Sequence, residues 1–356
     1  MNFDALWSKL QKAPTFVPSI FPIPNSNTDK SEQLATPFEP NENYFTIRVN
    51  EMFLSYERKW FSTYDPVVLS VTQFNYDGEK KTVPFVVGPG LLSNLPASVK
   101  VPEGMIYRNT TVAGTHPFKG GTVCTSIILC RMRQENYLRK ILKIIEQTAG
   151  TYMGGFATML NPYMKVANIV LDGIDQLFDS GDIHPLIGYR NEISRNASDN
   201  FLPGYYVMIN IEEHKIDAKK FFVKDNILLY GDSLATAKPF RAGDYVLYSI
   251  MSQSMRDDIE VLPVFKQWEE LRGYTTDLPE VNDEDWKQIK ARLFSLHNSL
   301  WKSPDLTNKQ ASVLAEEYKQ IILQLKAAKA FMGADKIERK PIALIDREAL
   351  DILNLK

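Results

Sequence analysis

The amino-acid sequence predicts an α+β protein: an antiparallel, β-sandwich-like sheet system with an inserted helical pair, followed by a C-terminal helical hairpin. Three observations lead to this prediction. Stretches rich in β-branched and aromatic residues, typical of strands, lie within residues 44–130 and 183–252. The intervening segment 134–180 and the later segment 282–333 place apolar residues at helical spacing instead. Strands before and after a helical block indicate one sheet system with a helical insertion.

The chain of 356 residues is longer than one hydrophobic core usually needs, so we expect more than one folded body. Hydrophobic residues make up 44% of the chain, which is ample for a packed interior. Pattern and composition divide it into an N-terminal helix and extended arm (1–43), a mixed sheet domain (44–272), a helical hairpin (282–333) and a C-terminal tail (334–356).

The strand signals are clearest where a turn motif separates two of them. Residues 67–76 and 82–87 flank Asp77-Gly78, a dipeptide that supplies the positive φ angles of a tight hairpin turn. Further strands are expected at residues 122–130, 205–211, 221–223, 227–230 and 245–251, with a turn at Asp225-Asn226.

Two helical regions are expected in the second half of the chain. A helix at 258–272 is expected to cover the sheet together with the segment 134–180. Residues 282–333 break at Ser303-Pro304, and Thr307 and Gln310 then have the spacing of a capping box, so this region reads as an antiparallel hairpin. Two helices alone bury little, and the hairpin must therefore dock on the sheet domain or on another chain.

Residues 147–164 carry no formal charge and follow the basic amphipathic segment 131–145. We favour the interpretation that 134–180 is a helical layer buried over the sheet. The alternative is a conditionally membrane-active protein that uses the segment 131–178, with Arg139, Lys140, Ile141 and Lys143 meeting the membrane. The segment contains too many polar residues for an ordinary transmembrane helix.

Charge and cysteine usage restrict the function further. A net charge of −2 gives no reason to expect nucleic acid as a partner. Cys124 and Cys130 are the only cysteines, and six residues of strand hold them roughly 20 Å apart, too far to bridge. Without a disulfide framework or a leader at Met1, we expect a cytoplasmic protein. The four histidines never fall at metal-ligand spacing, so neither a metal nor a cofactor is expected.

Residues 226–230 read as a strand that runs into Gly-Asp-Ser-Leu at 231–234. This tetrapeptide resembles the first sequence block of the GDSL (SGNH) esterases, in which the serine after a strand is the nucleophile. The resemblance implies a doubly wound α/β fold, an oxyanion hole from a glycine and an asparagine, and a D-x-x-H dyad near the C-terminus. Phe294 stands three residues before His297, where that dyad requires aspartate. A serine hydrolase at Ser233 is therefore the second alternative, and a turn after a strand is the simpler interpretation.

The function expected from these patterns is non-catalytic. The chain is interpreted as an interaction or assembly protein that binds other protein subunits, or itself, through its arm, hairpin and tail. The candidate contact residues are Phe3, Trp7 and Leu10 in the arm, Leu314, Tyr318 and Ile321 in the hairpin, and Ile345, Leu350 and Leu353 in the tail.

Overall fold

The structure, a computed structural model, confirms the predicted α+β class. It describes residues 7, 18–32, 34, 36–55, 58–59, 62–88, 105–133, 172–173, 175, 183–194 and 202–334. The chain divides into two compact units, Met1–Gln253 and Ser254–Lys356. The predicted inserted helical pair at 134–180 lies almost entirely outside the described residues.

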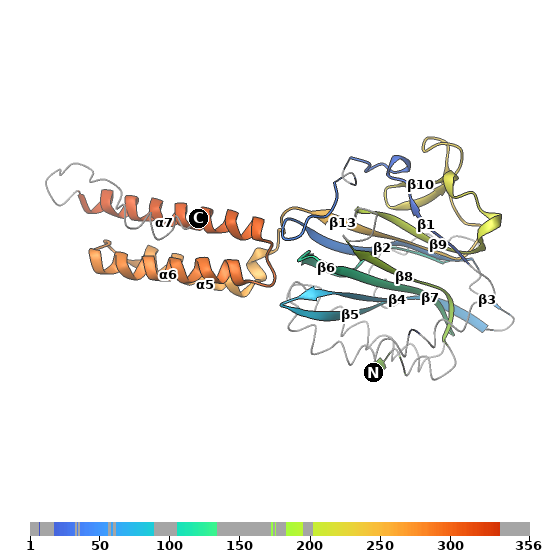
Figure 1. Cartoon of the computed structure of the whole chain (residues 1–356), viewed down its shortest axis with the longest axis horizontal. Coiled ribbons are helices and arrows are strands. Elements are labelled where there is room, and N and C mark those ends of the chain that lie inside the picture. The colour runs from blue at the N-terminus through green and yellow to red at the C-terminus, as the bar shows by residue number, and fades with distance from the viewer. Residues whose placement is uncertain are drawn as a thin grey trace. The chain divides into compact units, whose positions relative to one another are not determined.

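The first unit contains a five-stranded antiparallel sheet, here called sheet I (Figure 1). Its strands, in spatial order, are β1 (Pro18–Ile23), β9 (Gly204–Glu212), β13 (Tyr245–Gln253), β2 (Tyr44–Leu54) and β6 (Met105–Pro117). The sheet therefore joins strands from both sides of the segment 134–180, as the sequence predicts.

A second antiparallel sheet, sheet II, is built around a long hairpin. Its strands are β3 (Arg58–Lys59), β4 (Ser62–Tyr76), β5 (Glu79–Val87), β7 (Thr122–Arg133) and β8 (Ile183–Ser194). Strand β4 pairs with both β5 and β7, and β7 pairs with β8. The β4–β5 turn is the predicted one: Asp77 and Gly78 have φ angles of 53° and 76°, the left-handed values that a tight hairpin requires.

Sheets I and II pack face to face in a sandwich-like arrangement. Their shared core is one cluster of buried apolar side chains from both sheets. Sheet I contributes, among others, Phe45, Ile47, Met52, Val112, Met208 and Val246, and sheet II contributes Val68, Phe74, Phe85, Val123, Ile127 and Leu129. The core side chains of β7 alternate along the strand, which is the periodicity that places one set of residues on a single face.

A small third sheet, sheet III, lies on the other side of sheet I (Figure 1). It consists of β10 (Phe221–Lys224), β11 (Ile227–Tyr230) and β12 (Lys238–Pro239). The β10–β11 turn uses Asp225 and Asn226, with φ angles of 53° and 63°. The short 3₁₀ helices η1 (Asn25–Asn27), η2 (Glu213–Lys215) and η3 (Ala218–Lys220) complete this side of the unit.

The second unit contains η4 (Ile259–Val261) and three helices, α5 (Pro263–Asp277), α6 (Asp283–Lys302) and α7 (Asn308–Ala334). Asn282 caps α6 in a capping box with Asp285. The helix expected to cover the sheet, at 258–272, corresponds to α5, and it belongs to this unit because Trp268 stacks on Tyr318 of α7 at 4.1 Å between ring centroids. The unit boundary after Gln253 thus precedes the predicted one at residue 272.

Burial of Tyr318 makes the helical unit sensitive to alkali. Burial, followed by the nearby carboxylates of Glu317 and Glu269, raises the pKa of Tyr318 to about 12. The folded state thus retains a proton that the unfolded chain releases near pH 10, so stability falls as the pH rises between the two pKa values. We expect the wild-type protein to lose helical stability relative to Tyr318→Phe above about pH 10.

Urea unfolding followed by circular dichroism at the helical band, repeated from neutral to alkaline pH, measures this difference. Below about pH 9 the difference between the two proteins should be constant. A difference that stays constant up to about pH 11 would contradict the assignment of the alkaline loss to Tyr318.

Candidate functional site

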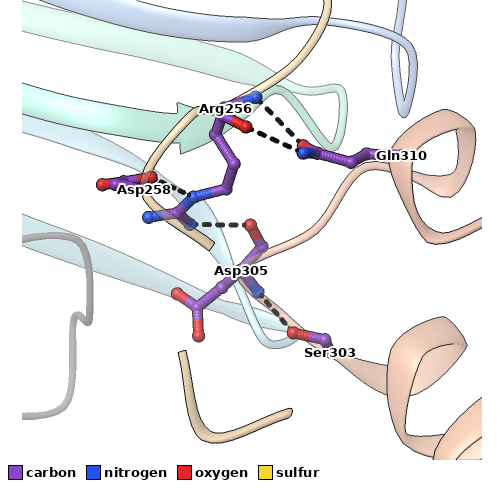
Figure 2. Close-up of polar contacts among 5 residues, drawn as sticks. All are labelled: Arg256, Asp258, Ser303, Asp305 and Gln310. Atoms are coloured by element: carbon purple, nitrogen blue, oxygen red, sulfur yellow. Dashed lines mark hydrogen bonds and ion pairs between the residues drawn. The ribbon is translucent and has the colours of Figure 1, made fainter. Parts of the chain in front are cut away.

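The segment that precedes α5 is fastened to the α6–α7 connection by Arg256 (Figure 2). The fully buried Arg256 side chain pairs through Nε with a carboxylate oxygen of Asp258 at 2.6 Å. Its Nη1 donates to the backbone carbonyl of Asp305 at 3.0 Å. The Asp305 backbone N–H in turn donates to the Ser303 hydroxyl at 3.3 Å. The α6–α7 connection is thus held at both the carbonyl and the N–H of Asp305.

Gln310 adds a second tie between the same segments. Its side-chain amide brackets the Arg256 backbone: Oε1 accepts from the Arg256 N–H at 3.0 Å, and Nε2 donates to the Arg256 carbonyl at 2.9 Å (Figure 2). The Gln310 N–H donates to the Thr307 hydroxyl at 3.2 Å, which is one half of the predicted capping box.

Helix α6, which leads into this connection, has one apolar face buried and carries two exposed aromatic side chains elsewhere. The buried face carries the predicted stripe of Trp286, Ile289, Leu293, Leu296 and Leu300. On a different face Phe294 is 37% exposed and Trp301 is 43% exposed. Residues seven apart in a helix lie on the same side, two turns from one another. The two exposed rings therefore form one strip, here called the α6 aromatic strip.

Polar contacts and charges frame the α6 aromatic strip. The Trp301 indole N–H donates to Nε2 of His297 at 3.2 Å. Lys287 lies a further seven residues before Phe294, so the same side of the helix continues into a cation. The Lys287 ammonium is 3.7 Å from a Glu284 carboxylate, and both side chains are more than 70% exposed, so the pair is weak. The strip is thus aromatic at one end and cationic at the other.

The structure places two predicted hairpin contacts inside the helical unit. Leu314 and Tyr318 are 5% and 4% exposed, and Tyr318 stacks on Trp268 with an interplanar angle of 3°. Ile321 is half-buried. Leu314 and Tyr318 therefore contribute to the packing of α7 on its neighbours. The side chains that remain available to a partner are elsewhere on the unit.

Of the predicted arm residues, Trp7 is described and lies against sheet II. A Cβ built on Gly188 of β8 would be 3.7 Å from Cη2 of Trp7 and 3.3 Å from Cγ1 of Ile128. Trp7 is half-buried there, so its ring packs beside the chain's own sheet. The other predicted contacts lie outside the described residues: Phe3, Leu10, Ile345, Leu350 and Leu353, with Arg139, Lys140, Ile141 and Lys143 of the membrane alternative.

The Gly-Asp-Ser-Leu segment forms an exposed turn after β11. The Ser233 hydroxyl lies 2.8 Å from the Thr236 hydroxyl, and the Ser233 carbonyl accepts from the Ala237 N–H at 2.8 Å. Asp232 pairs with Lys220 at 2.8 Å. Every paired strand of sheets I to III is antiparallel, so the doubly wound fold that the esterase resemblance implies does not occur in the part of the chain that the structure describes.

The two cysteines are free and lie on β7. Burial raises the pKa of Cys130 far above its usual value, and burial also raises the pKa of Cys124, although the neighbouring Arg190 opposes this. Both therefore remain protonated thiols at neutral pH. Among the described residues, no group of His, Cys, Asp and Glu is arranged to hold a metal ion. No helix there combines the length and apolar character needed to cross a membrane.

Sequence reasoning did not single out the exposed aromatic residues of the α6 aromatic strip. Phe294 and Trp301 fall outside the regular apolar stripe of their helix, and that stripe is the strongest signal in the segment. The available signal was their seven-residue spacing, continued by Lys287. Comparison of the chain with protein families, curated proteins and solved structures finds no match.

Proposed function

We propose that this chain is a non-catalytic interaction protein that assembles with itself. In this proposal the C-terminal tail of one copy docks on the α6 aromatic strip of another copy. The observation that carries it is the exposure of Phe294 and Trp301 on one side of a helix whose core stripe is already buried. Large aromatic side chains presented together are the residues that most often dominate the free energy of binding at an interface.

The chemistry of the tail suits this surface. Residues 345–353 combine the apolar Ile345, Leu350, Ile352 and Leu353 with the acidic Asp346, Glu348 and Asp351 and one cation, Arg347. An apolar and acidic peptide can cover the two rings and place carboxylates near Lys287 and its neighbours. Binding of a short peptide segment in a groove on a partner is a common mode of protein recognition.

The dimensions of the unit bear on which copy supplies the tail. Lys326 lies over the Trp286 ring at 3.8 Å, so α7 ends beside the start of α6. At 1.5 Å per residue, the axial path from Ala334 back past Lys326 to the level of Phe294 is about 24 Å, and crossing to the exposed side adds about 10 Å. Residues 335–345 span at most roughly 36–40 Å when fully extended, so Ile345 would reach Phe294 of its own copy only through an almost straight connection. Leu350 and Leu353 have enough chain before them to reach the strip in either copy, and the origin of the tail is therefore decided by experiment.

Light scattering coupled to size-exclusion chromatography tests the proposal with the full chain. We expect concentration-dependent association at about 100 µM that is lost in Phe294→Ser/Trp301→Ser and in a chain ending at Ala334. Val313→Ser is the matched control, because Val313 is an equally exposed apolar side chain (44%) on α7. It should leave association unchanged.

A mixing experiment separates the two possible origins of the tail. The double variant retains its tail, and the shortened chain retains its aromatic strip. If the tail docks between copies, the two proteins form a mixed complex although neither associates alone. A full chain that remains monomeric at every concentration, or variants that associate as the wild type does, would overturn the proposal.

We further propose that this assembly occurs in the cytoplasm. A chain with only two cysteines, both buried, has no disulfide framework, and this fits a protein of a reducing compartment. Fluorescence imaging of the tagged full chain in cells measures the location, and a signal confined to another compartment would contradict this proposal.

A further inference from the structure

A cavity of about 360 Å³ lies beside sheet III in the first unit. It is formed by η2, the end of β9 and the three short strands of sheet III, far in sequence from the α6 aromatic strip. Its volume is at the lower end of the range for small-molecule sites, enough for a ligand of one or two rings.

Three aromatic side chains form the apolar part of this cavity. Phe221 meets Tyr230 edge-on at 4.9 Å and Phe240 edge-on at 5.1 Å between ring centroids. Phe221 is fully buried and Phe240 nearly so, whereas Tyr230 is 38% exposed. The register pairs Phe221 with Tyr230 and Tyr230 with Lys238, so these three side chains share one face of the sheet.

Three cations line the same cavity: Lys215, Lys238 and Arg241. The Arg241 guanidinium pairs with the buried Glu51 carboxylate at 3.0 Å and is held in place by it. Lys215 pairs with Glu212 at 3.1 Å, but this pair is largely exposed and therefore weak. Lys238 is exposed and lies in the same cross-strand row as the Tyr230 ring. The lining thus places three cations beside a set of aromatic rings, and Arg241 and Lys215 are each paired with a carboxylate.

We propose that this cavity binds a small, flat aromatic anion, such as an aromatic carboxylate or phosphate monoester. The ring of the ligand would pack against Tyr230 and Phe240, because aromatic rings stack or meet edge to face. Its anionic group would be bound by Lys238 and Lys215, with Arg241 contributing positive charge from the wall. Burial of the ligand ring would exclude water from these ion pairs and strengthen them.

Isothermal titration calorimetry of the full chain tests this site with phenyl phosphate and benzoate as probes. Inorganic phosphate and benzyl alcohol serve as the anion without a ring and the ring without a charge. We expect at least one aromatic anion to bind about tenfold more tightly than either of these. Lys238→Gln and Tyr230→Ser should each weaken that binding at least about fivefold. Lys224→Gln removes an exposed lysine of β10 that does not line the cavity and should have no effect.

Loss of binding can be told from loss of folding in these variants. Tyr230 and Lys238 are exposed, so both variants should fold, and circular dichroism verifies this. Selective weakening of binding by these two variants supports the site. Comparing phenyl phosphate with benzoate then tells phosphate from carboxylate recognition. Absence of binding by both aromatic anions at about 10 mM, or binding that neither variant changes, would overturn the proposal. Equal affinity for inorganic phosphate and for phenyl phosphate would refute the role of the aromatic rings in binding. None of these results depends on self-assembly.

Discussion

Replacing Glu51 with alanine is expected to destabilise the sheet unit by about 3–5 kcal/mol. Glu51 lies on β2, and its carboxylate is fully buried between sheets I and III. One oxygen accepts from Arg241 at 3.0 Å and the other accepts from the Leu228 N–H at 2.9 Å. The substitution would leave the Leu228 amide without its acceptor and Arg241 without its counter-ion, and each loss carries a desolvation cost.

Hydrogen exchange measured by mass spectrometry provides the local readout for this prediction. The peptide that contains β11 (Ile227–Tyr230) includes the Leu228 amide, so its protection should fall more than that of the β4–β5 hairpin. Glu51→Gln should reduce this protection less than Glu51→Ala does, because the amide oxygen of glutamine can still accept one of the two hydrogen bonds. Glu79→Ala, which removes an exposed carboxylate paired with Lys81, is the surface control and should leave exchange unchanged. Equal protection in Glu51→Ala and the wild type would refute the anchoring role of Glu51.

The elements best predicted from sequence are those with a local physical cause. Asp77-Gly78 and Asp225-Asn226 both adopt the positive φ angles that their hairpin turns require. The α6 stripe from Trp286 to Leu300 is buried as its spacing indicates. In each case the decisive interaction lies within a few residues along the chain, so a short window of sequence contains it.

What the sequence could not reveal depends on contacts between distant residues. The separate sheet III is held by Glu51, whose partners Arg241 and Leu228 lie more than 170 positions away. The assignment of α5 to the helical unit depends on the stacking of Trp268 and Tyr318, fifty residues apart. A local pattern identifies each of these segments as a strand or helix, but it does not identify its neighbour.

The candidate contact surface shows the same limit. An apolar stripe such as Leu314 and Tyr318 looks alike whether it faces the protein's own core or a partner, and here both side chains are buried within the helical unit. The proposed contact surface is instead defined by exposure, because Phe294 and Trp301 lie off the stripe and remain in contact with solvent. The helical periodicity therefore predicts which residues of a helix are buried, but it does not tell a core contact from a contact with a partner.

Replacing Arg256 with alanine is expected to destabilise the helical unit by about 3 kcal/mol, the second large effect. The substitution removes the ion pair with Asp258 and leaves the Asp305 carbonyl without its donor, although the partial exposure of Asp258 (29%) limits the cost. Urea unfolding followed at the helical band of circular dichroism measures it.

Arg272→Ala breaks an ion pair with Glu269 whose side chains are 50% and 40% exposed, and it should cost no more than about 0.5 kcal/mol. Because Arg256 and Gln310 hold the α6–α7 connection, Arg256→Ala should also weaken self-association. Full stability in this variant would show that the Arg256 side chain does not help to hold the connection, which Gln310 would still tie to the backbone at position 256.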